Sequence, residues 1–260
     1  MVHSDTAQNT PVAAGAGGSH YVPQPESVHD LGKVMEATIL AMAALAEPGE
    51  AGNHIVRIQH YVQALAVKLQ SSGAHAGVLT ERTIRNLVRA VAWHDIGNSG
   101  VPDRILLKPG PLSDDELDIV KTHPTLGRNV IDQIKHGAGV SSDFLDLARE
   151  VAYAHQERWD GSGYPQGLSG ERIPVSARLM ALADAYDALT SDRVYRAGVP
   201  HDKAVQQMFQ QRAAHFDPDM VDAFIEIQDE FQAIAERYAD TDLDFQKKID
   251  YMVKAIAESP

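Results

Sequence analysis

Histidines and aspartates occupy positions in this chain where helical periodicity would place apolar side chains. His94 and Asp95, for example, each follow an apolar residue of one buried stripe by seven positions. Burying such groups costs several kcal/mol each unless something pairs with them. Taken singly, each is explained by a hydrogen-bonded core histidine or a capping aspartate; together they favour a metal site in a helical core. The six residues are His54, His94, Asp95, His123, His155 and Asp184.

The adjacent pair His94-Asp95 allows the histidine to serve one metal ion while the aspartate bridges to a second. Imidazole and carboxylate ligands suit Fe, Mn, Zn, Ni or Co, and ligand type alone does not choose among them. Two ions about 3.5–4 Å apart would activate a bridging water and clamp the phosphoryl oxygens of an in-line displacement. The pair therefore predicts hydrolysis of a phosphoester.

A glycine-rich segment directly after His155 predicts a tight loop next to this site. Within it, Trp159 and Tyr164 could pack against a planar base or could anchor the loop itself. Further along, Arg193 and Arg196 could hold phosphate oxygens. A solvated or ion-paired surface is the alternative for both arginines.

The elements that must position these residues are helices, because apolar residues recur at spacings of three and four almost everywhere after Leu31. Residues 1–27, rich in Gly, Ala, Pro and Ser, predict a disordered leader or linker, and residues 28–260 a single helical domain. Ser113 and Glu116 form a capping box that opens one helix. The sequence therefore predicts an all-α bundle. Its expected helices span residues 31–45, 55–69, 84–97, 113–120, 144–155, 174–189 and 218–257.

Composition excludes several classes of protein. The net charge of −13 argues against a nucleic-acid polymer as partner, because phosphate contacts need clustered positive charge. The absence of cysteine excludes disulfides and thiolate-held metals. No apolar run approaches the roughly 18 residues that a membrane span needs. We therefore expect a cytoplasmic protein without membrane contact.

The motifs in order resemble those of the HD-GYP family, bacterial phosphodiesterases of cyclic di-GMP within the HD phosphohydrolase superfamily. His94-Asp95-Ile96-Gly97 and Gly163-Tyr164-Pro165 carry the resemblance, which extends from about Met35 to Phe224. The other matching segments are residues 50–54, 105–110, 121–124, 157–165, 183–190, 192–196 and 215–218. The ordered set is far more specific than one His-Asp pair.

The resemblance implies an all-α HD-type bundle whose core holds two or three metals, with iron or manganese favoured. By motif, His54, His94, Asp95 and Asp184 would hold one ion, while Asp95 with His123 and His155 would hold the second. Glu50 matches the acidic residue that serves an additional metal in some members. Arg193, Arg196 and Tyr164 match positions expected to meet the substrate, and His94 with Asp95 form the catalytic pair. The implied reaction opens cyclic di-GMP to pGpG, with GMP as a further product.

Two positions depart from the family pattern. Asn98 stands where the family usually has lysine, so a cation near the scissile phosphate becomes a neutral amide. Gln156 stands where a second consecutive histidine is frequent, which argues against a third metal and favours a binuclear site. The alternative function is therefore a catalytically weak or inactive cyclic-dinucleotide sensor or interaction module. The resemblance is also compatible with a homodimer and with protein partners in cyclic di-GMP signalling.

Overall fold

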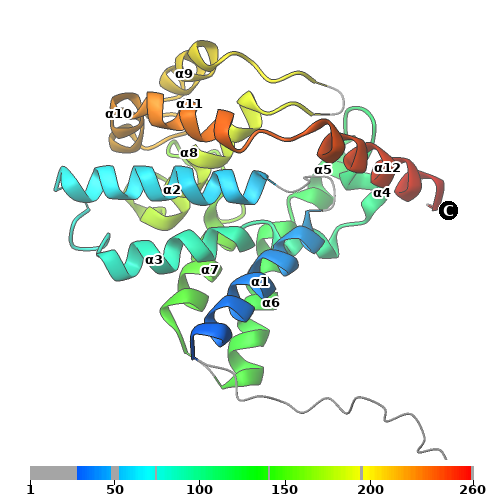
Figure 1. The fold of residues 1–260 in the computed structure, drawn as a ribbon, viewed down its shortest axis with the longest axis horizontal. Helices are drawn as coiled ribbons and strands as arrows, with labels where there is room; N and C mark the ends of the chain where they lie inside the picture. Colours follow the sequence, from blue (N-terminus) through cyan, green and yellow to red (C-terminus); the bar gives the residue numbers. More distant parts are fainter. Residues whose placement is uncertain (1–27, 48–52, 74, 140, 194–195, 259–260) are drawn as a thin grey trace, which may run out of the picture.

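The computed structural model describes residues 28–47, 53–73, 75–139, 141–193 and 196–258, and this part of the chain is helical (Figure 1). Among the described residues there is no strand, only two isolated backbone bridges. The predicted all-α fold is thus confirmed, while the predicted leader, 1–27, lies outside the described residues. The α-helices are α1 Val28–Ala46, α2 His54–Ser71, α3 Glu81–Ala90, α4 Asp103–Leu106, α5 Asp114–Val120, α6 His123–Ala138, α7 Asp143–Ala154, α8 Val175–Thr190, α9 His201–Gln210, α10 Pro218–Glu226, α11 Gln228–Arg237 and α12 Asp242–Glu258.

Helix α2 lies at the centre of the larger of two main hydrophobic clusters, where it contacts α3, α8, α10 and α11 (Figure 1). Its apolar stripe, which includes Ile58, Tyr61 and Leu65, is fully buried. Helix α8 is apolar on most of its faces and is buried along most of its length, as expected for a helix inside a core. Burial of these apolar faces is the main force that holds the helices together.

A second cluster joins α1 and α7 around Trp93, whose indole N–H donates to the carbonyl oxygen of Ile39. Val91 belongs to the larger cluster and Trp93 to the second. The following residues, His94 and Asp95, therefore lie where the two clusters meet, so both sides of this turn are fixed by packing.

The chain around His94 is not the continuous helix expected over residues 84–97. Helix α3 ends at Ala90, and two 3₁₀ helices follow, η1 Val91–Trp93 and η2 Ile96–Gly100. The backbone of α6 packs directly on this turn. A Cβ on Gly97 would lie 2.0 Å from the carbonyl oxygen of His123, so only glycine permits the approach. His94 is nevertheless buried as expected.

The remaining elements agree with the sequence in part. The capping box of Ser113 and Glu116 is present at the start of α5. The stretch 218–257 is divided among α10, α11 and α12, with Asp217 capping α10. A short 3₁₀ helix, η3 Gly170–Arg172, precedes α8. Among the described residues, no helix combines the length and the apolar character needed to cross a membrane.

Candidate metal centre

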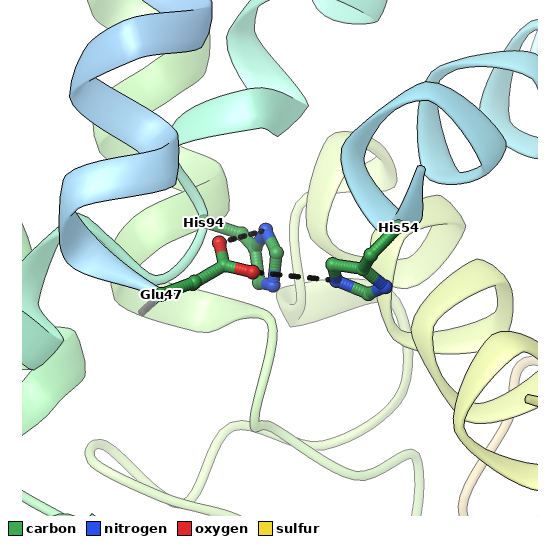
Figure 2. A group of neighbouring side chains, drawn as sticks. All are labelled: Glu47, His54 and His94. Carbon is green, nitrogen blue, oxygen red and sulfur yellow. Dashed lines mark ion pairs between the residues drawn. The ribbon is translucent and has the colours of Figure 1, made fainter. Parts of the chain in front are cut away.

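A first group of candidate ligands brings together Glu47, His54 and His94 (Figure 2). Glu47 follows the last residue of α1, His54 is the first residue of α2, and His94 directly follows η1. The Glu47 carboxylate lies between the two rings, with Oε2 3.5 Å from His54 Nε2 and Oε1 3.8 Å from His94 Nδ1. All three residues are buried. Ends of helices, rather than helix faces, supply this group.

A second group adjoins the first and consists of Asp95, His123 and His155. Asp95 Oδ1 lies 3.3 Å from His123 Nε2 and 3.2 Å from His155 Nε2, while its Oδ2 lies 3.7 Å from His94 Nε2. Asp95 thus faces ligands of both groups, which is the arrangement that a bridging carboxylate requires.

The histidine rings are oriented so that Nε2 faces the centre. Nδ1 lies 3.0 Å from a backbone carbonyl oxygen in His94 and His155, and 2.7 Å in His123. In His54, Nδ1 lies 2.8 Å from Oδ2 of Asp187. A carbonyl or carboxylate can only accept, so each Nδ1 carries the proton and each Nε2 keeps its lone pair. The three carbonyl acceptors belong to Val91, Val120 and Val151.

The charge states also suit a metal. Burial lowers the pKa of His94 to about 4 and lowers that of His123 below its usual value. Burial alone would raise the pKa of Asp95, but His94, His155 and His123 hold it well below its usual range. Burial acts to lower the pKa of His155, yet the neighbouring Asp95 carboxylate raises it above its usual value. An ionised aspartate beside imidazoles whose pKa is lowered, as in His94 and His123, is a form that transition metals bind.

One buried oxygen tests whether a metal fits. Asp95 Oδ1 is buried and accepts no well-aligned hydrogen bond from the described residues, although two histidine nitrogens face it. A buried anionic oxygen in this state is costly, and a cation between it and the imidazole nitrogens would satisfy all of them. The other edge of the carboxylate is reachable, because 24% of the side chain is exposed. The residues present therefore fit divalent metal ions.

Neither group includes the predicted ligand Asp184. Asp184, on α8, shifts the pKa of His94, His123 and His155, so it lies within electrostatic range, but it belongs to neither group among the described residues. Its role as a ligand stays a prediction. Glu50 lies outside the described residues.

Sequence reasoning missed Glu47 and Asp187. Glu47 directly precedes the helix-breaking pair Pro48-Gly49. The motif match selected Glu50, the acid on the other side of this pair. Asp187 lies within the matched segment 183–190 and three residues after Asp184, on the same helix. It received no role, although a carboxylate in so apolar a helix is itself a signal of a buried partner.

The loop after His155 is shaped by Glu157, whose carboxylate accepts the backbone N–H groups of Gln166 at 2.7 Å and Leu168 at 2.9 Å. Gly163 is required because a Cβ there would lie 2.3 Å from the backbone nitrogen of Arg158. The fold places Tyr164 beside the second group, with its ring 6.3 Å from that of His123. Burial, with Asp95 and Asp184, raises the pKa of Tyr164 to about 12, so its hydroxyl remains a donor at neutral pH.

Trp159 anchors this loop through its backbone. Its N–H donates to the carbonyl oxygen of His215 at 2.9 Å, and its own carbonyl accepts from Gly170 at 2.9 Å. Both bonds are made by the backbone, so the role of the Trp159 ring stays a prediction. Of the two aromatic residues of the loop, Tyr164 is the one that lies near the candidate ligands.

Arg193 and Arg196 lie beyond α8 in a backbone bridge, with N–H to carbonyl distances of 2.7 and 3.0 Å between the two residues. Both line a cavity of about 640 Å³ that also includes Arg57 and residues of the α11–α12 junction. The guanidinium of Arg196 also donates to the carbonyl oxygen of Ala188. The two arginines thus line one cavity. Their contact with a substrate stays a prediction.

Asn98 lies next to the candidate metal centre. Its side-chain amide donates to Oδ2 of Asp95 at 3.0 Å. The residue that departs from the family pattern therefore contacts the carboxylate that faces ligands of both groups.

Two adjoining His/carboxylate groups within an all-α bundle define a candidate binuclear metal protein. A profile of the HD domain family matches residues 49–220, and the chain belongs to this family. The resemblance predicted from the motifs is thereby confirmed at the level of the family.

Curated relatives agree with this assignment. A "Cyclic di-GMP phosphodiesterase" of Vibrio cholerae is 44% identical over 207 residues, which cover 79% of this chain and 42% of that protein. A "Probable cyclic di-GMP phosphodiesterase" of the same organism is 43% identical over 213 residues, covering 81% of this chain and 48% of the relative. The chain thus spans less than half the length of each.

A solved structure shares the fold. The crystal structure of a cyclic GMP-AMP specific phosphodiesterase of Vibrio cholerae superposes with a TM-score of 0.52 at 17% sequence identity. The match covers 85% of this chain and 60% of that one. At this identity the likeness supports the helical fold alone.

Proposed function

We propose that this chain is a metal-dependent phosphodiesterase that opens cyclic di-GMP to pGpG, with GMP as a further product. The observation that carries the proposal is the position of Asp95, whose carboxylate faces His94 on one side and His123 and His155 on the other. The names of the relatives supply the substrate, and the HD domain family supplies the metal dependence.

The metals in this proposal are two divalent ions, iron or manganese, with zinc, nickel and cobalt as alternatives. The first group, with Asp184 as a further ligand, would hold one ion and the second group the other. When bound, such ions activate water as a nucleophile and neutralise charge on the attacked phosphate. The absence of a consecutive histidine at Gln156 supports two ions rather than three.

The chain's own groups then bind and orient the substrate. Tyr164 lies at the edge of the second group with a protonated hydroxyl, which suits donation to a phosphate or ribose oxygen. Arg193 and Arg196 supply cationic donors for phosphate oxygens. The exposed edge of the Asp95 carboxylate marks the side from which the substrate reaches the centre.

The test uses the whole chain purified anaerobically, with metal content measured and products separated by chromatography. We expect bound Fe or Mn, and conversion of cyclic di-GMP to pGpG faster than hydrolysis of 3′3′-cyclic GMP-AMP. Metal-loaded protein that leaves cyclic di-GMP intact would refute the activity, and faster hydrolysis of the mixed dinucleotide would refute the assigned substrate.

A second candidate function is a sensor that binds the dinucleotide without turnover. The hydrogen bond from Asn98 to Asp95 favours it, because a neutral amide lies where a cation would stabilise the developing charge on phosphate. Calorimetric binding without product would support the sensor. A cytoplasmic location, a homodimer and protein partners in signalling also belong to the proposal, and cell fractionation, size-exclusion chromatography and cross-linking test them.

A further inference from the structure

The start of α2, which carries His54, is fastened to the junction between α11 and α12. The Asn53 side-chain amide donates to the carbonyl oxygen of Ala239 at 3.1 Å. On the next turn, Arg57 donates to the carbonyl oxygen of Tyr238 at 2.9 Å and to the carboxylate of Asp240 at 3.3 Å. Residues on both sides of His54 thus contact one short segment, 238–240, far away in the sequence.

Arg57 also holds the carboxylate that orients His54. Its Nε donates to Asp187 Oδ1 at 2.5 Å and its NH2 group to Oδ2 at 3.0 Å, a two-point contact that fixes the carboxylate plane. The same Oδ2 accepts from His54 Nδ1 at 2.8 Å. All three residues are at most 4% exposed. Because a buried charge without its partner is costly, this network has one favourable arrangement.

Helix α12 reaches the network through Asp240. Lys248, on α12, is buried and donates to Asp240 Oδ2 at 2.9 Å, while the other oxygen of that carboxylate accepts from Arg57. An uninterrupted series of hydrogen bonds therefore connects α12 with Asp240, Arg57, Asp187 and His54.

We propose that Arg57 is the positioning residue for His54, and that the α11–α12 junction, by fixing Arg57, sets the metal affinity of the group Glu47, His54 and His94. This inference rests on the proposed metal-dependent function. It adds that the C-terminal helix controls one metal site and leaves the other unchanged. The second group differs from His54 in this respect, because each of its histidines donates Nδ1–H to a backbone carbonyl of its own turn.

The first experiment compares Arg57→Met with Arg178→Met in the full chain. Arg178 donates to Asp217 Oδ2 at 2.6 Å, and within the described part of the chain this second buried Arg–Asp pair has no hydrogen bond to a candidate ligand. Both variants therefore remove one partner of a buried ion pair. Metal affinity is measured by titrating Co²⁺ into chelator-treated protein and following the visible absorption bands of bound cobalt.

We expect Arg57→Met to weaken one of two Co²⁺ sites by about 10- to 100-fold and to change its bands, because outer partners of ligating histidines typically contribute this much. Arg178→Met should lower thermal stability but keep both affinities. Arg57→Lys, which keeps the charge but loses the two-point contact, should recover part of the affinity. Equal affinities in the two methionine variants would overturn the positioning role.

Milder variants cover the case in which Arg57→Met does not fold. Asp240→Asn removes the charge that holds Arg57 from the C-terminal side, and Asp222→Asn, which weakens an exposed pair with Arg212, is its control. We expect a several-fold loss at one Co²⁺ site for the first and none for the second. Unchanged binding in Asp240→Asn would refute control by the junction. Wild-type protein that binds no Co²⁺, Mn²⁺ or Fe²⁺ would refute the proposed function itself.

Discussion

The group of Asp95, His123 and His155 obtains its supporting hydrogen bonds from backbone carbonyls within single turns, whereas His54 in the neighbouring group depends on side chains. The supports of His54 are Asp187 on α8, Arg57 on α2 and, through Arg57, segment 238–240. The two groups adjoin at His94 and Asp95, yet one is built locally and the other from three distant parts of the chain.

This difference has a physical consequence. A backbone carbonyl in a helical turn keeps its place as long as the turn persists, so the second group should tolerate changes elsewhere. In the first group, His54 should respond to changes at Asp187, Arg57 or Asp240, so this group is the one open to control by a partner or by the C-terminal helix.

The largest effect is expected at Asp95, which faces ligands of both groups. Asp95→Ala should remove most bound metal and all hydrolysis, because each ion would lose a ligand at once. Metal analysis together with product chromatography measures both. A variant that keeps two metals per chain would show that Asp95 does not bridge.

Much of this centre could be predicted from the sequence, since His54, His94, His123 and His155 are all buried near one another as their spacing indicates. The apolar stripes marked the segments that carry these histidines, although the structure places the residues at helix ends rather than on helix faces. Glu47 and Arg57 escaped prediction because their roles depend on which helix ends meet. Sequence spacing alone does not encode that long-range packing. Helices α6 and α9 were also missed, although both are amphipathic.

A smaller, selective effect is expected for the first group. Glu47→Gln should reduce bound metal from two ions to one while the second group keeps its ion, because an amide oxygen is a weaker ligand than a carboxylate. Glu50→Gln is the matched comparison, since Glu50 was the acid favoured by motif. A greater loss of metal in Glu50→Gln than in Glu47→Gln would reverse the assignment.

The support of His54 also predicts a pH dependence. Burial alone would raise the pKa of Asp187, but hydrogen bonds from His54 and Arg57 hold it well below its ordinary value of 3.8. Its ionised form therefore contributes stability that is present above pH 3.8 and is lost as the pH falls toward the folded-state pKa. Urea unfolding of metal-free protein at pH 5 and pH 3 should show a smaller loss in Asp187→Asn than in wild type. Equal losses would contradict the network.

A moderate effect is expected at the substrate side, away from both groups. Arg193→Ala and Arg196→Ala should each raise KM for cyclic di-GMP roughly tenfold, the value of a charge-assisted bond to phosphate, with metal content unchanged. Steady-state kinetics at matched metal loading provide the measurement. If neither variant alters KM, both arginines are solvated or ion-paired surface residues, as in the alternative interpretation of the sequence.

An effect of similar size is expected at Asn98, which contacts the carboxylate that faces ligands of both groups. Its amide donates to Asp95 Oδ2 at 3.0 Å and carries no charge. A lysine has a longer side chain and could extend past this carboxylate toward the phosphate, where a cation stabilises developing negative charge. Asn98→Lys should then raise kcat about tenfold with metal occupancy unchanged, since one well-placed electrostatic contact has this value.

The competing outcome for Asn98→Lys follows from the same hydrogen bond. If the ammonium instead pairs with Asp95, it competes with metal for that carboxylate, and metal affinity falls while kcat does not rise. Asn98→Ala separates the two effects, because it removes the amide bond without adding a charge and should lower metal affinity only slightly. Rates and metal content measured side by side for the three proteins distinguish these outcomes, and an unchanged or lower kcat in Asn98→Lys at full metal loading would refute the electrostatic role of this position.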